Sequence, residues 1–219
     1  MTTFFIDSAD RNQVTRLLST GLFGGVTTNP EILSNAGLGS NDIPTLVDWA
    51  TGAGAKRVFV QSWGKTTGEI AERGQELRNL GSNVTVKVPA SRQGIEAAKI
   101  LSGAGPVLVT AVYTAAQVLP IIASDASYLA PFVGRMIAAG RDAVAEITRM
   151  QQVIDATKSD LEILAGSLRT PSQVLDLASA GVRNVTLGPP VWDLFFNDEL
   201  THASVERFEE LATQQPAGE

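Results

Sequence analysis

Lys87 is the residue of this sequence that is most clearly placed to react chemically. It lies in the run Val84–Pro89, Val-Thr-Val-Lys-Val-Pro, whose alternation predicts a strand with its valines on one face and Lys87 on the other. If that second face lines the inside of a closed sheet, the ammonium group is poorly hydrated. Burial lowers the pKa of a lysine and frees the neutral amine that attacks carbonyl carbons. The alternative is a strand-end lysine whose ammonium group reaches water.

Side chains that could carry protons lie at or near the ends of two other predicted strands. Asp7 ends the strand 3–7 in the inward phase, and a carboxylate near a neutral lysine can shuttle protons during imine formation. Asp7 could instead cap the helix that follows Ser8. Thr110 and Tyr113 could orient a catalytic water or hold a substrate oxygen, although Tyr113 could equally be a packing residue with a solvated hydroxyl.

Arg135, Ser167 and Arg169 form a third group, which could bind an anion. Two guanidinium groups and a hydroxyl suit a tetrahedral anion, and late loops of many barrels bind phosphate. These residues predict a small anionic substrate. The alternative is that both arginines pair with surface carboxylates such as Asp142 or Asp176.

The elements that must position these residues alternate regularly along the chain. Strands are predicted at 3–7, 25–29, 57–61, 84–88, 107–111, 128–132, 163–167 and 184–187. Helical segments with recognisable ends lie between them, such as the one that opens at Thr170-Pro171 and closes at Gly181. We therefore expect an α/β fold: a single-domain (β/α)₈ TIM barrel over residues 1–219, with a C-terminal helix. An open doubly wound sheet is the alternative.

A parallel barrel gathers the C-terminal ends of its strands at one mouth, where barrel enzymes have their active sites. Polar residues expected at this mouth are Asp7, Thr28, Asn29, Gln61, Lys87, Thr110, Arg135, Ser167 and Arg169. Nearly every predicted strand contributes one, so the set carries more weight than any single member.

Composition excludes several other classes of function. The 219 residues include no cysteine and one histidine, which argues against disulfide scaffolds, Cys- or His-rich metal sites and thiol nucleophiles. A formal net charge of -6 without any basic run argues against nucleic acid and anionic membranes as partners. No segment approaches the roughly 18 to 20 apolar residues of a membrane span. We expect a cytoplasmic protein.

Five motifs follow one another in the order of a known family. They are Thr27–Pro30 (TTNP), Val86–Pro89 (VKVP), Thr110–Tyr113 (TAVY), Ala130–Arg135 (APFVGR) and Ser167–Pro171 (SLRTP). Together with the opening Phe5-Ile6-Asp7, they resemble the small transaldolase and fructose-6-phosphate aldolase family over essentially the whole chain.

The resemblance implies a (β/α)₈ barrel and Schiff-base catalysis with no metal and no organic cofactor. By resemblance, Lys87 forms the imine, Asp7 carries protons, and Asn29 contacts the dihydroxyacetone unit. Arg135, Ser167 and Arg169 resemble the family's phosphate-binding residues. Short members of the family form pentamers or decamers, which implies a homo-oligomer with the helix 199–213 at a subunit interface.

Two positions bear on the subclass. Transaldolases of the family have Glu at the end of the third strand and Phe on the sixth, whereas the aldolases that release dihydroxyacetone have Gln and Tyr; this chain has Gln61 and Phe132. Protons would then pass through a water held by Gln61, Thr110 or Tyr113. Because Phe132 lacks the Tyr hydroxyl, we expect transfer of dihydroxyacetone from a ketose 6-phosphate to an aldehyde. The alternatives are an aldolase releasing dihydroxyacetone, the same chemistry on a sulfonated ketose, and a catalytically weakened barrel that binds sugar phosphates.

Overall fold

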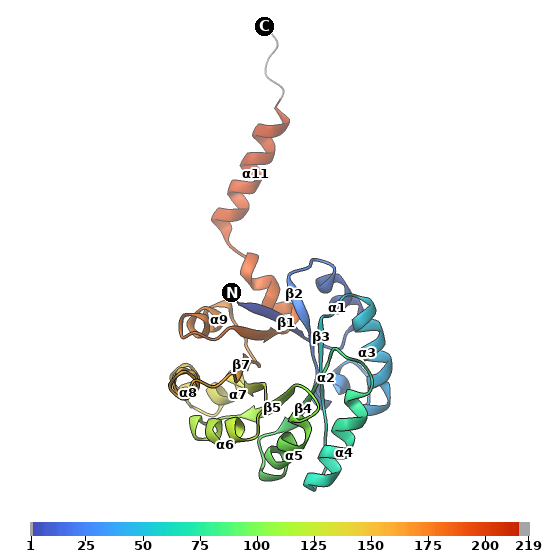
Figure 1. The fold of residues 1–219 in the computed structure, drawn as a ribbon. Helices are drawn as coiled ribbons and strands as arrows, with labels where there is room; N and C mark the ends of the chain where they lie inside the picture. The colour runs from blue at the N-terminus through green and yellow to red at the C-terminus, as the bar shows by residue number, and fades with distance from the viewer. Residues whose placement is uncertain (1, 215–219) are drawn as a thin grey trace.

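The computed structural model describes residues 2–214, within which eight parallel strands close into a barrel (Figure 1). The strands are β1 (Thr3–Asp7), β2 (Phe23–Thr27), β3 (Arg57–Gln61), β4 (Val84–Pro89), β5 (Val107–Val112), β6 (Tyr128–Pro131), β7 (Glu162–Ala165) and β8 (Asn184–Leu187). Each strand pairs with its neighbour in chain order, and β8 pairs with β1. The (β/α)₈ barrel prediction is confirmed, and the open doubly wound sheet is wrong.

Helices follow the strands and surround the barrel (Figure 1). They are α1 (Arg11–Leu18), α2 (Pro30–Asn35), α3 (Ile43–Gly52), α4 (Thr67–Arg78), α5 (Arg92–Ser102), α6 (Val118–Ala123), α7 (Val133–Ala138), α8 (Ala143–Thr157), α9 (Pro171–Ser179), α10 (Pro189–Asp193) and α11 (Glu199–Thr213). Short 3₁₀ turns at Ser40–Asp42, Ala115–Gln117 and Leu194–Phe196 precede α3 and α6 and follow α10.

The helix ends follow the capping signals of the sequence. Thr170 caps α9 by accepting a hydrogen bond from a backbone N–H, and Gly181 adopts φ 93°, a conformation that glycine reaches without steric cost. The cap of α1 is Asp10. The alternative role of Asp7 as a helix cap is therefore wrong, and its carboxylate is available for other contacts.

Two strands end two residues earlier than the sequence predicts. β2 spans Phe23–Thr27 instead of 25–29, because Asn29 leaves the sheet to cap α2. β7 ends at Ala165, and Ser167 adopts φ 58°, the left-handed region that turns the chain out of the strand. Both corrections change which side chains face the barrel mouth.

The inside of the barrel is filled by a layer of apolar side chains. Phe5, Phe59, Leu108, Ala130 and Leu164 form this cluster, with the rings of Phe5 and Phe59 edge to face at a centroid distance of 5.2 Å. A larger apolar core lies between the strands and the surrounding helices. The barrel is therefore packed beneath its mouth, and polar chemistry is confined to the strand ends.

The helix α11 is the exception to this packing. It spans Glu199–Thr213, as the sequence predicts, projects away from the barrel and buries none of its residues (Figure 1). Among residues 2–214, no helix combines the length and apolar character needed to cross a bilayer.

Candidate active site

A cavity of about 320 Å³ opens at the C-terminal ends of the strands. Seven of the predicted site residues line it: Asp7, Asn29, Lys87, Phe132, Arg135, Ser167 and Arg169. They come from β1, β4 and the segments that follow β2, β6 and β7. The closure of the barrel thus brings together residues up to 162 positions apart in the chain, between 7 and 169.

Lys87 is buried, with 4% of its surface exposed. Its Nζ donates a hydrogen bond to the backbone carbonyl of Thr28 at 2.6 Å. Burial lowers the pKa of Lys87 to about 8, an effect that the charge of Asp7 partly opposes. A substantial fraction of this lysine is therefore an uncharged amine near neutral to mildly basic pH, in contrast to a lysine extended into bulk water.

Asp7 lines the same cavity as Lys87, and the two charges interact. Burial raises the pKa of Asp7, while the charge of Lys87 and a hydrogen bond from Thr27 lower it. The Thr27 hydroxyl donates to Asp7 Oδ1 at 2.6 Å and lies 2.5 Å from the hydroxyl of Thr186. A carboxyl group with a raised pKa can hold and release a proton near a neutral amine.

Thr27 and Thr186 are site residues that sequence reasoning missed. Both line the cavity, whereas the predicted Thr28 turns its hydroxyl to the carbonyl of Phe59 at 3.0 Å. The position at which β2 ends would have identified Thr27. In a strand that ends at Thr27, alternation directs the Thr27 side chain into the barrel. Thr28 contributes instead through its backbone carbonyl, which accepts from Lys87.

The three candidates for holding a catalytic water lie around the cavity and do not line it. Gln61 lines a separate apolar cavity beside Trp63. The Thr110 hydroxyl is buried and has no hydrogen-bond partner within the described residues. The ring of Tyr113 packs edge to face on Phe132 at a centroid distance of 6.1 Å. Of the three, Thr110 has the buried, unsatisfied oxygen that an ordered water would satisfy.

The two arginines of the anion-binding group have different surroundings. Arg135 pairs with Glu31 on α2, which also lines the cavity, and its guanidinium lies 5.1 Å from the centroid of the Phe132 ring. The predicted alternative partner Asp142 caps α8 instead. Across residues 2–214, Arg169 forms no ion pair. Its guanidinium is therefore available to a ligand.

Gly134 holds the anion-binding segment against α7. Its N–H donates to the carbonyl of Ser167 at 2.8 Å, and a Cβ at this position would lie 2.5 Å from that oxygen and 2.9 Å from Ser167 Oγ. Only a glycine fits this approach without displacing the segment that carries Ser167 and Arg169.

We expect Gly134→Ala to raise KM for a phosphorylated ketose about tenfold while changing kcat much less, since overpacking costs about 1–3 kcal/mol and falls on the anion site. Steady-state kinetics measure this split. Gly68→Ala is the control, because a Cβ on Gly68 meets no atom within 4 Å. Equal KM values for the Gly134 and Gly68 variants would contradict the assignment.

Comparison with known proteins identifies the family to which this chain is similar. A model of the family described as "Transaldolase/Fructose-6-phosphate aldolase" matches residues 4–217. A "Probable transaldolase" of Coprothermobacter proteolyticus is 31% identical over 207 residues, which cover 94% of both chains. Another "Probable transaldolase", of Methanococcus maripaludis, is 32% identical over 210 residues, again 94% of both chains.

Solved structures with much lower sequence identity share the fold alone. A dihydrodipicolinate synthase from Rhodopseudomonas palustris superposes with a TM-score of 0.60 at 15% identity, covering 86% of this chain and 70% of that chain. The family match over nearly the whole chain and the relatives above 30% identity give a more specific result: the chain belongs to the transaldolase/fructose-6-phosphate aldolase family.

Proposed function

We propose that this protein is a Schiff-base transaldolase that transfers a dihydroxyacetone unit from a ketose 6-phosphate to an aldehyde. The observation that carries this proposal is the buried amine of Lys87, whose pKa is lowered to about 8 beside a carboxyl group with a raised pKa. An uncharged amine and a proton carrier in one cavity are what imine formation requires.

In the proposed reaction, the Lys87 amine adds to the C2 carbonyl of the ketose, and loss of one water leaves an imine. The C3–C4 bond breaks when the C4 hydroxyl loses its proton, and the aldehyde leaves with the phosphate end. The electron pair of that bond stays on the lysine-bound three-carbon enamine. Asp7 accepts and returns the protons. The enamine then adds to an acceptor aldehyde, and hydrolysis restores the amine.

Phe132 favours transfer over release of free dihydroxyacetone. It lines the cavity where a hydroxyl could otherwise assist protonation of the enamine, and Tyr113 packs against it through its ring. Gln61 is the register partner of Lys87 and lines the neighbouring cavity, which shares Asn29 with this one. Without a hydroxyl at position 132, the enamine has one group fewer to deliver a proton and persists for an acceptor.

A product assay tests this proposal. Fructose 6-phosphate is supplied with and without erythrose 4-phosphate, and free dihydroxyacetone and the transfer product are quantified. We expect transfer to dominate. Release of dihydroxyacetone as the main product would assign the aldolase alternative. Ligand-induced thermal stabilisation without either product would assign a sugar-phosphate-binding protein.

We also propose that α11 packs on a second copy of this chain in a homo-oligomer, a pentamer or decamer by family resemblance. Val205, Phe208 and Leu211 recur at helical spacing on this helix, and Phe208 is 67% exposed. An isolated helix of 15 residues is marginal in water, and its apolar stripe is typical of a subunit contact.

We expect Phe208→Glu to weaken self-association by about 100-fold or more, because the interface would bury an unpaired charge. Sedimentation velocity over a range of protein concentrations measures the change. Glu206→Ala, on the other side of α11, is the control. A wild-type protein that sediments as a monomer would refute the interface.

A further inference from the structure

Glu31 is an acidic residue in a site otherwise suited to anions. It is the second residue of α2, its side chain is 65% exposed at the mouth, and its carboxylate pairs with the guanidinium of Arg135. Both residues line the cavity that contains Lys87. One of the two arginines expected to bind the anionic end of the substrate is therefore already paired with an acid.

The charges lining the cavity nearly cancel. When Lys87 is protonated and Asp7 is ionised, Lys87, Arg135 and Arg169 contribute three positive charges and Asp7 and Glu31 two negative charges, so one positive charge remains. Transfer of a proton between Lys87 and Asp7 does not change this balance. Without Glu31, the same cavity would hold two positive charges.

This balance distinguishes between anions of the same shape. A phosphate ester has a second pKa near 6 and is a dianion at pH 8, whereas a sulfonate is a monoanion. A dianion must compete with the Glu31 carboxylate for Arg135 and leaves one negative charge uncompensated. A monoanion is neutralised by Arg169 while the pair of Glu31 and Arg135 stays intact.

We propose that Glu31 is a specificity-determining residue that biases the site toward substrates with a monoanionic terminal group, such as a sulfonated ketose, over dianionic phosphate esters. The inference rests on the proposed function for the identity of the substrate as a ketose. The preference of the cavity for monoanions over dianions, which we call the charge bias, does not depend on the reaction. It can be measured by binding alone, without turnover.

The influence of Glu31 extends across the cavity to the catalytic groups. Its negative charge is one of the causes that raise the pKa of Asp7, and the positive charge of Arg169 opposes it. A carboxylate whose field reaches Asp7 also acts on an anion bound between Arg135 and Arg169, because an effective dielectric near 20 leaves charge interactions strong over a few ångströms.

The first test compares kcat/KM for fructose 6-phosphate and for its analogue with a sulfonate on C6, at pH 8, in the wild type and in Glu31→Gln and Glu31→Asp. We expect the wild type to favour the sulfonate. Glu31→Gln should shift the ratio toward the phosphate by up to about fivefold, mainly through KM, because the pair of Glu31 and Arg135 is more than half exposed. Glu31→Asp keeps the charge and should keep most of the wild-type ratio.

The second test uses small probe anions and does not depend on catalysis. Methyl phosphate and methyl sulfate have similar shapes but differ by one charge at pH 8, because the second pKa of a phosphate ester is near 6. Their binding is followed by ligand-observed NMR, with Arg169→Gln as a control for binding at this site. We expect Glu31→Gln to strengthen methyl phosphate binding up to about fivefold and methyl sulfate binding clearly less, because the pair of Glu31 and Arg135 is more than half exposed.

Two results would overturn the proposal. One is a wild type that prefers the phosphate and an unchanged ratio in Glu31→Gln. The other is a result with the probe anions: an equal effect of Glu31→Gln on both would show that Glu31 does not discriminate by charge, and binding of neither would show that the cavity is not an anion site. Failure of the ketose reaction together with a shifted probe-anion ratio would reject the proposed enzyme activity and leave the charge bias of the site standing.

Discussion

Lys87→Met is expected to lower kcat/KM for a ketose 6-phosphate by about 10⁴-fold or more, because it removes the nucleophile on which both halves of the reaction depend. Methionine has a similar length and fills the buried position without a charge. The loss should therefore appear in activity and not in the fold. Steady-state kinetics and thermal unfolding measure the two separately.

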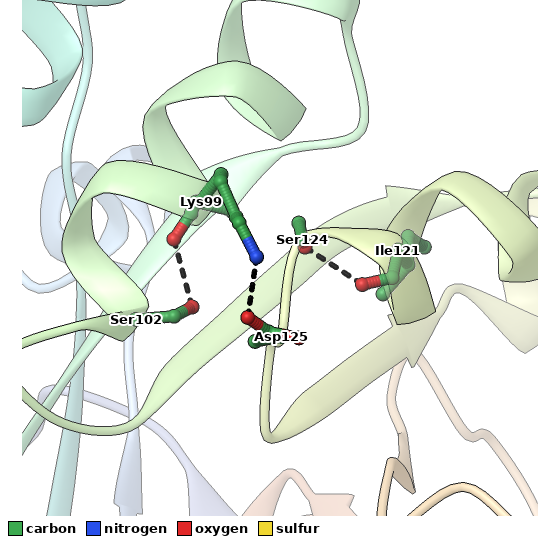
Figure 2. A network of polar contacts seen from close by, with 6 residues as sticks. Lys99, Ser102, Ile121, Ser124 and Asp125 are labelled. Atoms are coloured by element: carbon green, nitrogen blue, oxygen red, sulfur yellow. Dashed lines mark hydrogen bonds and ion pairs between the residues drawn. The ribbon is translucent and has the colours of Figure 1, made fainter.

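Lys99→Met is the matched control for this variant. Figure 2 shows Lys99 on α5 with its amine directed at the carboxylate of Asp125. Both side chains of this ion pair are more than half exposed, so the pair contributes little to stability, and it lies outside the cavity. Lys99→Met should retain wild-type activity. A Lys87→Met variant with more than about one-hundredth of wild-type activity would contradict the role of Lys87 as nucleophile.

Asp7→Asn has the second largest expected effect, a loss of about 10²–10⁴ in kcat, because it removes the group that carries protons. A second effect follows from the electrostatics. The charge of Asp7 raises the pKa of Lys87 against the larger effect of burial, so removing it lowers that pKa further below 8. Imine formation should therefore rise with pH through about 8 in the wild type and at lower pH in the variant.

Asp10→Asn is the control for Asp7→Asn. Asp10 caps α1, and asparagine is an equally good cap, so neither activity nor stability should change. The pH dependence of adduct formation separates a proton carrier from a structural carboxylate. A slow Asp7→Asn variant whose profile coincides with that of the wild type would argue against the coupling of Asp7 and Lys87.

Much of the fold follows from patterns that the sequence carries locally. The alternation of valines around Lys87 predicts the face on which the lysine lies, because the period of a strand is two regardless of its neighbours. The Thr170-Pro171 cap and Gly181 bound α9 for similarly local reasons. Closure of the barrel then follows from repeated parallel strand–helix units.

The parts of the site that the sequence did not predict depend on contacts between distant segments. Thr186 enters only because β8 closes on β1 and brings its hydroxyl to Thr27, 159 residues away. Glu31 has the sequence of an ordinary first-turn acid of a helix, and its partner Arg135 lies 104 residues further on. The sequence predicts Thr28 in place of Thr27, because a pattern locates strand ends only to within a few residues and a shift of one residue reverses the face.

Borohydride trapping with fructose 6-phosphate, followed by intact mass and peptide mapping, tests the role of Lys87 most directly. We expect one reduced three-carbon adduct per chain, located on Lys87, which forms faster as the pH rises through about 8 and is missing from Lys87→Met. An adduct that persists in Lys87→Met, or a wild type that forms none while binding the substrate, would contradict it.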